Sequence, residues 1–144
     1  MTVSDIFLLR GVVKCIQQKR ENERKNVLPP LTAERIFKMI SEAIFFEEGD
    51  TLRVLLPCEI DHHVAKPIRE EVDTKIFMIS PRLLVLDFSN VSFMDSSGIG
   101  LILGRAVLCD ERGCRVNLFG LSRTLMKLVR LSGIEKIKNI SISD

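Results

Sequence analysis

The chain has 144 residues, of which 46% are hydrophobic and 28% charged, with a net charge of +2 at pH 7. This length and composition are typical of one soluble globular domain with its own core and a short additional segment. No apolar run approaches the roughly 18 residues of a membrane-spanning helix, and no secretory signal peptide is apparent.

The positive charge is concentrated near the N-terminus. Residues 1–41 hold eight Lys or Arg against four Asp or Glu, whereas residues 42–144 hold 13 against 15. A mildly acidic main domain without a basic stripe argues against direct nucleic-acid binding. We expect reduced thiols and no metal site, because metal-ligand spacing is lacking among the four cysteines, Cys15, Cys58, Cys109 and Cys114.

Residues 1–40 are predicted to form an N-terminal extension that is either helical or disordered. An apolar stripe follows one helical face, and it consists of Ile6, Leu9, Val13 and Ile16. A polar run and Pro29-Pro30 come after it, and the prolines stop a helix there. The extension could be a docking helix, a membrane-surface helix or a disordered leader. Translation from Met39 would give a self-sufficient product, which leaves open that the extension is not native.

From residue 41 to residue 144 the pattern predicts a single α/β domain. Two short strands, 43–47 and 52–56, are joined by a hairpin turn, and a helix begins near Val64. The remaining elements are a strand at 83–88, a helix from Gly98, a strand at 115–119, a helix capped by Ser122 and an edge strand at 138–142. This order predicts a mixed, mostly parallel sheet with helices packed on it and right-handed crossovers.

The stretch from Leu83 to Gly100 is the most informative part of the chain. Its strand has the pattern of one buried on both faces, and the following helix presents a stripe that we expect to pack on the sheet: Ile99, Ile102, Leu103, Ala106 and Val107. Between them, Asp95, Ser96 and Ser97 are forced to the surface at a helix N-terminus, where free N–H groups favour a phosphate. Gly98 and Gly100 would let the backbone of another protein approach closely.

A second polar segment is expected beside the first. Pro67 is tolerated best in the first turn of a helix, which places Asp61, His62 and His63 in the loop ahead of it. The carboxyl ends of parallel strands meet at one edge of a sheet, so this loop and the Ser96 segment should lie together. Arg105 lies off the apolar stripe, and we expect it to face solvent near that edge.

Enzymatic alternatives fit the sequence poorly. A nucleophile elbow around Ser96 would need glycine where Met94 stands. Adjacent histidines rarely bind one metal ion together, and the chain has no other histidine. Leu103 occupies the position of the third glycine of a dinucleotide fingerprint. We therefore expect no catalytic residues and no cofactor.

Three segments resemble the STAS-domain anti-sigma factor antagonists: Glu59 to His63, Phe93 to Arg105, and Leu131 to Ile137. The resemblance covers the chain from about Ala43 to the C-terminus and is closer to sporulation members than to stress-response members. The pair Pro57-Cys58 departs from the small residue and glycine that the family usually has there, and the N-terminal extension is unlike compact members.

This resemblance implies a cytoplasmic regulator, not an enzyme, whose unmodified form binds an anti-sigma factor serine kinase and thereby releases a sigma factor. The kinase would phosphorylate Ser96, and a metal-dependent serine phosphatase would reverse the modification. No contact with nucleic acid or membrane is implied. The partner-binding residues would be Asp61, His62, His63, Asp95, Ser97, Gly98, Gly100 and Arg105. The alternative is a STAS-type scaffold or regulatory subunit of a membrane transport assembly, which the basic amphipathic N-terminal segment would favour.

Overall fold

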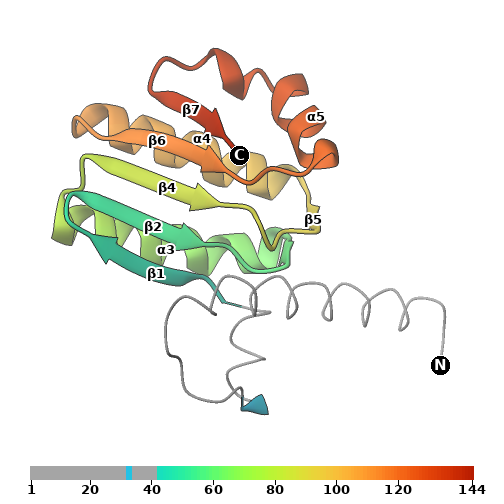
Figure 1. The fold of residues 1–144 in the computed structure, drawn as a ribbon, viewed down its shortest axis with the longest axis horizontal. Coiled ribbons are helices and arrows are strands. Elements are labelled where there is room, and N and C mark those ends of the chain that lie inside the picture. Colours follow the sequence, from blue (N-terminus) through green and yellow to red (C-terminus); the bar gives the residue numbers. More distant parts are fainter. Residues whose placement is uncertain (1–31, 34–41) are drawn as a thin grey trace, which may run out of the picture.

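The computed structural model describes residues 32–33 and 42–144, and the predicted N-terminal extension lies almost entirely outside them. A hairpin of β1 (Ile44–Glu48) and β2 (Thr51–Leu55) leads through β3 (Glu59–Ile60) into α3 (His62–Ile79). The chain continues (Figure 1) through β4 (Leu83–Asp87), β5 (Phe93–Met94), α4 (Ser96–Glu111), β6 (Arg115–Phe119), α5 (Arg123–Leu131), the 3-10 turn η1 (Ile134–Lys136) and β7 (Ile140–Ser143). The α/β architecture predicted from the sequence is confirmed.

The strand order explains how the helices are arranged. The main sheet runs β1-β2-β4-β6-β7, with β1 antiparallel to β2 and the other neighbours parallel. Each parallel connection steps in the same direction across the sheet, and right-handed crossovers therefore place their helices on the same face. Figure 1 shows α3 and α4 side by side behind the sheet, with α5 beside β7.

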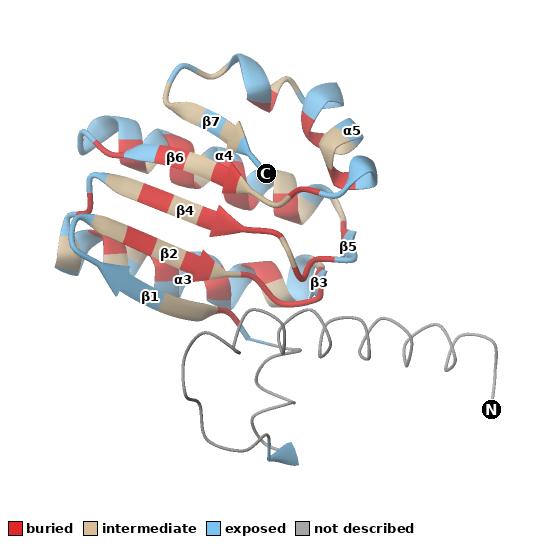
Figure 2. Ribbon diagram, in the orientation of Figure 1, coloured by how far each residue is buried: buried red, intermediate tan, exposed pale blue. Residues whose placement is uncertain are grey.

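The core lies between the sheet and these helices. Strand register aligns side chains of neighbouring strands in rows, and two helix-facing rows of the three central strands are fully buried: Val54, Leu86 and Leu118, and Leu52, Leu84 and Val116. The residues that alternate with them face the other way, and Figure 2 shows the resulting change between buried and half-buried positions along β2 and β4. The expectation that the strand at 83–88 is buried on both faces is therefore wrong for Leu83 and Val85, which are half-buried.

Helix α4 is rotated about its axis relative to the prediction. Its buried positions include Leu101, Ile102 and Ala106, whereas Leu103 is 37% and Val107 is 61% exposed. The predicted stripe is therefore only partly correct. Apolar residues lie on nearly every side of this helix, so their spacing alone could not select the side that packs.

We predict that a chain beginning at Met39 unfolds cooperatively. The described core cluster extends from Ala43 to Ile134 and includes residues of α3, α4 and α5, which is sufficient for an independent domain. Thermal or urea unfolding followed by circular dichroism would compare this shorter chain with the full chain. Loss of the cooperative transition in the shorter chain would mean that the first 38 residues belong to the core.

Candidate functional site

Two helix N-termini begin side by side at the carboxyl edge of the sheet. Strands β3 and β5 form a parallel pair in which Ile60 is opposite Met94, and the Asp95 N–H donates to the Ile60 carbonyl over 3.2 Å. Each of these strands leads directly into an N-cap aspartate, which is Asp61 for α3 and Asp95 for α4. The structure therefore brings the two polar segments together, as the sequence led us to expect.

Each aspartate stabilises the start of its helix in the same way. The Asp61 Oδ1 accepts from the Val64 N–H over 2.9 Å, and the Asp95 Oδ1 accepts from the Ser97 N–H over 2.8 Å. Ser96 is the first residue of α4 and is exposed, whereas Ser97 is half-buried. The free N–H groups and the dipole of such a helix end favour an added anion by about 0.3–1 kcal/mol.

The two histidines lie in the first turn of α3, and the prediction that they precede the helix is wrong. Asp61 caps the helix, which starts at His62, and Pro67 is accommodated in the second turn. Proline has no N–H, so the helix loses one backbone hydrogen bond there but keeps its capped start. His62 and His63 are both exposed, with their ring centroids 5.9 Å apart, and they remain at the same edge as Ser96.

The two glycines of α4 have different surroundings. A Cβ on Gly98 would lie 2.0 Å from the Met94 Cγ and 2.3 Å from its Sδ, whereas a Cβ on Gly100 would meet nothing within 4 Å. Gly98 is buried and Gly100 is exposed. Gly98 therefore permits close packing between β5 and α4 within the protein, and the expectation that it admits another protein's backbone is wrong. Gly100 is exposed, so the backbone of another protein could still approach closely there.

Arg105 is buried between α3 and α4, and the prediction that it faces solvent is wrong. Its side chain is 9% exposed, and its Nε lies 2.7 Å from the Asp73 Oδ1 in an ion pair whose geometry is not that of a hydrogen bond. Burial raises the pKa of the Asp73 carboxyl, although the Arg105 and Arg69 charges oppose this change. Burial also lowers the pKa of Arg105. The ion pair therefore joins α3 to α4 within the protein, and Arg105 is not available as a surface charge.

The sequence interpretation missed an exposed stripe on α4. Ser96, Gly100, Leu103 and Val107 follow one another at intervals of three or four residues, and all four are exposed. Phe93 of β5, two residues before the cap, is 53% exposed. The exposed serine therefore stands at one end of a narrow surface of small and apolar residues, which is typical of a protein-binding site.

The chemistry available to the described residues is limited. No group of three or more His, Cys, Asp or Glu side chains within residues 42–144 is placed to hold a metal ion. No described helix combines the length and apolar character that crossing a bilayer requires. Cys109 and Cys114 are buried free thiols, as expected, whereas Cys58 is disulfide-bonded, so the expectation of reduced thiols is wrong for Cys58. The arrangement at the two helix N-termini fits protein binding and covalent modification of a hydroxyl.

Comparisons with known proteins identify the family and the fold. The model of the STAS domain matches residues 36–143. An anti-sigma F factor antagonist of Paenibacillus polymyxa is 36% identical over 89 residues, which are 62% of this chain and 76% of that protein. The structure of the anti-sigma factor antagonist SpoIIAA in its unphosphorylated form is 30% identical with a TM-score of 0.63, and the match covers 71% of this chain and 88% of that one. The phosphorylated form of the Bacillus protein SpoIIAA is also 30% identical, with a TM-score of 0.58 and coverage of 71% and 91%.

We predict opposite effects of alanine at the two glycines. Gly98→Ala should destabilise the protein by about 1–3 kcal/mol, because its Cβ overpacks the buried Met94 side chain. Gly100→Ala is the matched control in the same helix, and it should be neutral or stabilising by up to about 1 kcal/mol, because alanine favours the helix. Urea unfolding measures both free energies. Equal stability of the two variants would contradict the close packing at Gly98.

Proposed function

This chain belongs to the STAS domain family, and we propose that it acts as an anti-sigma factor antagonist that is switched by phosphorylation of Ser96. The observation that carries the proposal is the exposed Ser96 hydroxyl at the start of α4, beside the capped start of α3. The unphosphorylated form would bind an anti-sigma factor that is also a serine kinase, and this binding would release a sigma factor. The similar protein SpoIIAA has been solved in both an unphosphorylated and a phosphorylated form, which supports such a switch.

The proposed partner-binding surface combines the two helix starts with the exposed stripe of α4. Its polar part is formed by Asp61, His62, His63, Asp95, Ser96 and Ser97, all at one edge of the sheet. Its apolar part is formed by Gly100, Leu103 and Val107. The surface thus has polar groups at one end and an apolar stripe running from it, and specific protein interfaces combine both kinds of contact. Arg105 supports this surface from beneath and is not part of the contact.

Phosphorylation would change this surface more than it changes the fold. A phosphoserine adds about −1.5 to −2 charges and three acceptor oxygens. The N-terminus of α4 tolerates an anion, whereas a partner fitted to a bare hydroxyl meets added bulk and negative charge beside Asp61 and Asp95. A penalty of about 2–3 kcal/mol would weaken binding roughly 30- to 150-fold, which is sufficient for a regulatory switch.

The complete cycle requires a phosphatase and a cytoplasmic setting. We propose a metal-dependent serine phosphatase that hydrolyses the phosphate from Ser96 and restores the binding form. The protein would then be a regulator and a substrate of both enzymes, with no catalytic residue or cofactor of its own. Its positive N-terminal segment is outside the proposed interface, and direct contact with nucleic acid or membrane is not part of the proposal.

We predict that Ser96, and not Ser97, accepts the phosphoryl group. Ser96 is exposed, whereas Ser97 is half-buried and its N–H is bound to Asp95. The test incubates the protein with labelled ATP and an anti-sigma factor serine kinase from the same organism, followed by phosphopeptide mapping. Ser96→Ala should abolish labelling, and Ser97→Ala should retain it. Label that persists in Ser96→Ala and disappears in Ser97→Ala would reverse the assignment.

We predict that Ser96→Asp folds normally but binds the same kinase at least 30-fold more weakly, which corresponds to about 2 kcal/mol. The physical reason is the negative charge placed at the interface on a helix end that tolerates it. Ser96→Asn is the control, because it has nearly the same shape without the charge. Calorimetry would measure binding, and thermal unfolding would measure stability. Equal affinity of the two variants would show that charge does not operate the switch.

A further inference from the structure

The sheet has a second face that the described helices do not cover, and we call it the open face. Strand register aligns its side chains in two rows, which are Phe46, Arg53, Val85, Asn117 and Ser141, and Ile44, Leu55, Asp87, Phe119 and Ser143. Both rows lie opposite the buried rows that contact α3 and α4. Mostly parallel sheets usually have layers on both faces. The crossovers of residues 42–144 supply a layer on only one of them.

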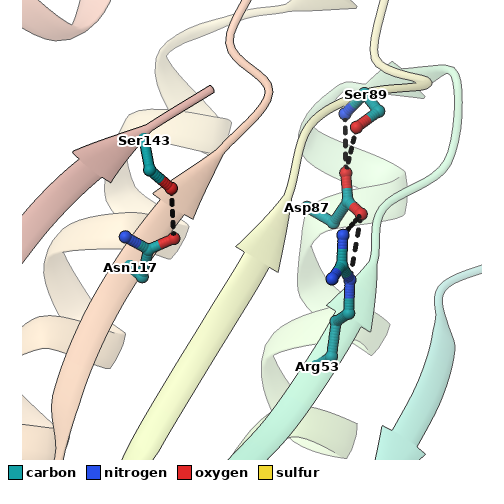
Figure 3. A network of polar contacts seen from close by, with 5 residues as sticks. All are labelled: Arg53, Asp87, Ser89, Asn117 and Ser143. Atoms are coloured by element: carbon teal, nitrogen blue, oxygen red, sulfur yellow. Dashed lines mark hydrogen bonds and ion pairs between the residues drawn. The ribbon is translucent and has the colours of Figure 1, made fainter.

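The open face is divided into an apolar half and a polar half. The apolar half lies toward β1 and consists of Ile44, Phe46, Leu55 and Val85, of which Phe46 is 44% exposed. The polar half lies toward β7, where Asn117 donates to the Ser141 Oγ over 2.9 Å and accepts from the Ser143 hydroxyl over 3.0 Å. Figure 3 shows the contact between Asn117 and Ser143.

The charged side chains that lie between the two halves, Arg53 and Asp87, pair with each other on the open face. Arg53 Nη2 donates to the Asp87 Oδ2 over 2.6 Å, and the other carboxylate oxygen accepts from the backbone N–H of Ser89 over 2.9 Å (Figure 3). The Arg53 guanidinium also lies over the Phe119 ring, 4.8 Å from its centroid. A layer placed on the apolar half would therefore not leave an unpaired carboxylate beneath it.

We propose that the N-terminal segment, residues 1–41, covers the apolar half of the open face with the stripe of Ile6, Leu9, Val13 and Ile16. The dimensions agree. As a helix, the stripe would span about 15 Å from Ile6 to Ile16, and a five-residue strand such as β2 or β4 is about 17 Å long. The three strands of the apolar half span about 10 Å, which is the diameter of one helix.

The point at which the segment joins the domain also favours this location. The N-terminal segment ends just before β1, the edge strand that borders the apolar half. Ile44 at the start of β1 pairs with Leu55. Residues 17–41 could span at most about 80 Å, which is long enough to return the stripe to the sheet. The STAS match begins only at residue 36. The stripe from Ile6 to Ile16 therefore lies outside the matched family domain.

The test uses the full chain and a single fluorescent probe. The protein has no Trp, so Phe46→Trp introduces a sole indole on the open face. With the stripe in place, this indole should emit at shorter wavelength and be quenched by acrylamide several-fold less than in the same variant that also carries Leu9→Glu and Val13→Glu. Phe77→Trp on α3 is the matched control, since Phe77 is 56% exposed on the helix side, and the stripe substitutions should leave it unchanged.

The possible results of this experiment distinguish the stripe from a second copy of the chain as the occupant of the open face. Equal quenching of the Phe46→Trp indole with and without the stripe substitutions would overturn the proposal. Shielding that survives these substitutions but disappears on dilution would assign the face to a second copy of the chain and would also overturn it. Circular dichroism checks that each variant remains folded.

A second measurement avoids destabilising substitutions. A photo-crosslinking phenylalanine analogue placed at position 13 of the full chain should form crosslinks to β1, β2 or β4, which mass spectrometry locates. Crosslinks confined to α3, α4 or a second chain would contradict the proposed location. Neither measurement depends on the kinase or on Ser96, so the proposed switch could fail while this inference holds.

Discussion

The strand order of the sheet is the constraint on which the other features depend. Every parallel connection steps in one direction, and right-handed crossovers then have only one face available to their helices. Helices α3 and α4 consequently lie side by side, and both start at the carboxyl edge of the sheet. The short β3–β5 pair brings these two starts into register, so that Asp61 and Asp95 cap neighbouring helices. The same constraint leaves the opposite face without a layer from this part of the chain.

The ion pair between Asp73, which is half-buried, and the buried Arg105 affects the packing of α4 more than its interaction energy suggests. Desolvation opposes both charges, so the pair is weak as a source of stability. An alternative packing of α4 would leave an unpaired charge against α3, and such packings are therefore penalised. If the first residue of a helix held in this way were phosphorylated, as we propose for Ser96, the surface charge would change while the helix kept its position. This separation of surface charge from position is what a binding switch at Ser96 requires.

The sequence predicted those features that are determined locally. The hairpin of β1 and β2 follows from its turn, where Gly49 has a φ of +58°, and α5 is capped by Ser122, whose Oγ accepts from the Leu125 N–H. The orientation of α4 was not predictable from residue spacing, because apolar residues lie on nearly every side of this helix. Arg105 was expected to face solvent because the sequence does not show that Asp73 of α3 lies beside it. Strands β3 and β5 have two residues each, too few for a periodic pattern. The position of the histidines was missed because the cap at Asp61 determines the helix start more strongly than Pro67 does.

The helix-side surface and the open face lie on opposite sides of one sheet, and this separation has a consequence for the N-terminal segment. A layer on the apolar half would contact side chains of β1, β2 and β4, whereas the proposed partner-binding surface lies at the starts of α3 and α4 and along α4. At the carboxyl edge, Asp87 at the end of β4 accepts a hydrogen bond from the Ser89 N–H in the connection to β5. The Asp87 carboxylate already pairs with Arg53, so its charge is not free to sense the other surface. An added layer could thus stabilise the sheet without obstructing Ser96, which is why this fold can carry an N-terminal addition and keep its helix-side surface open.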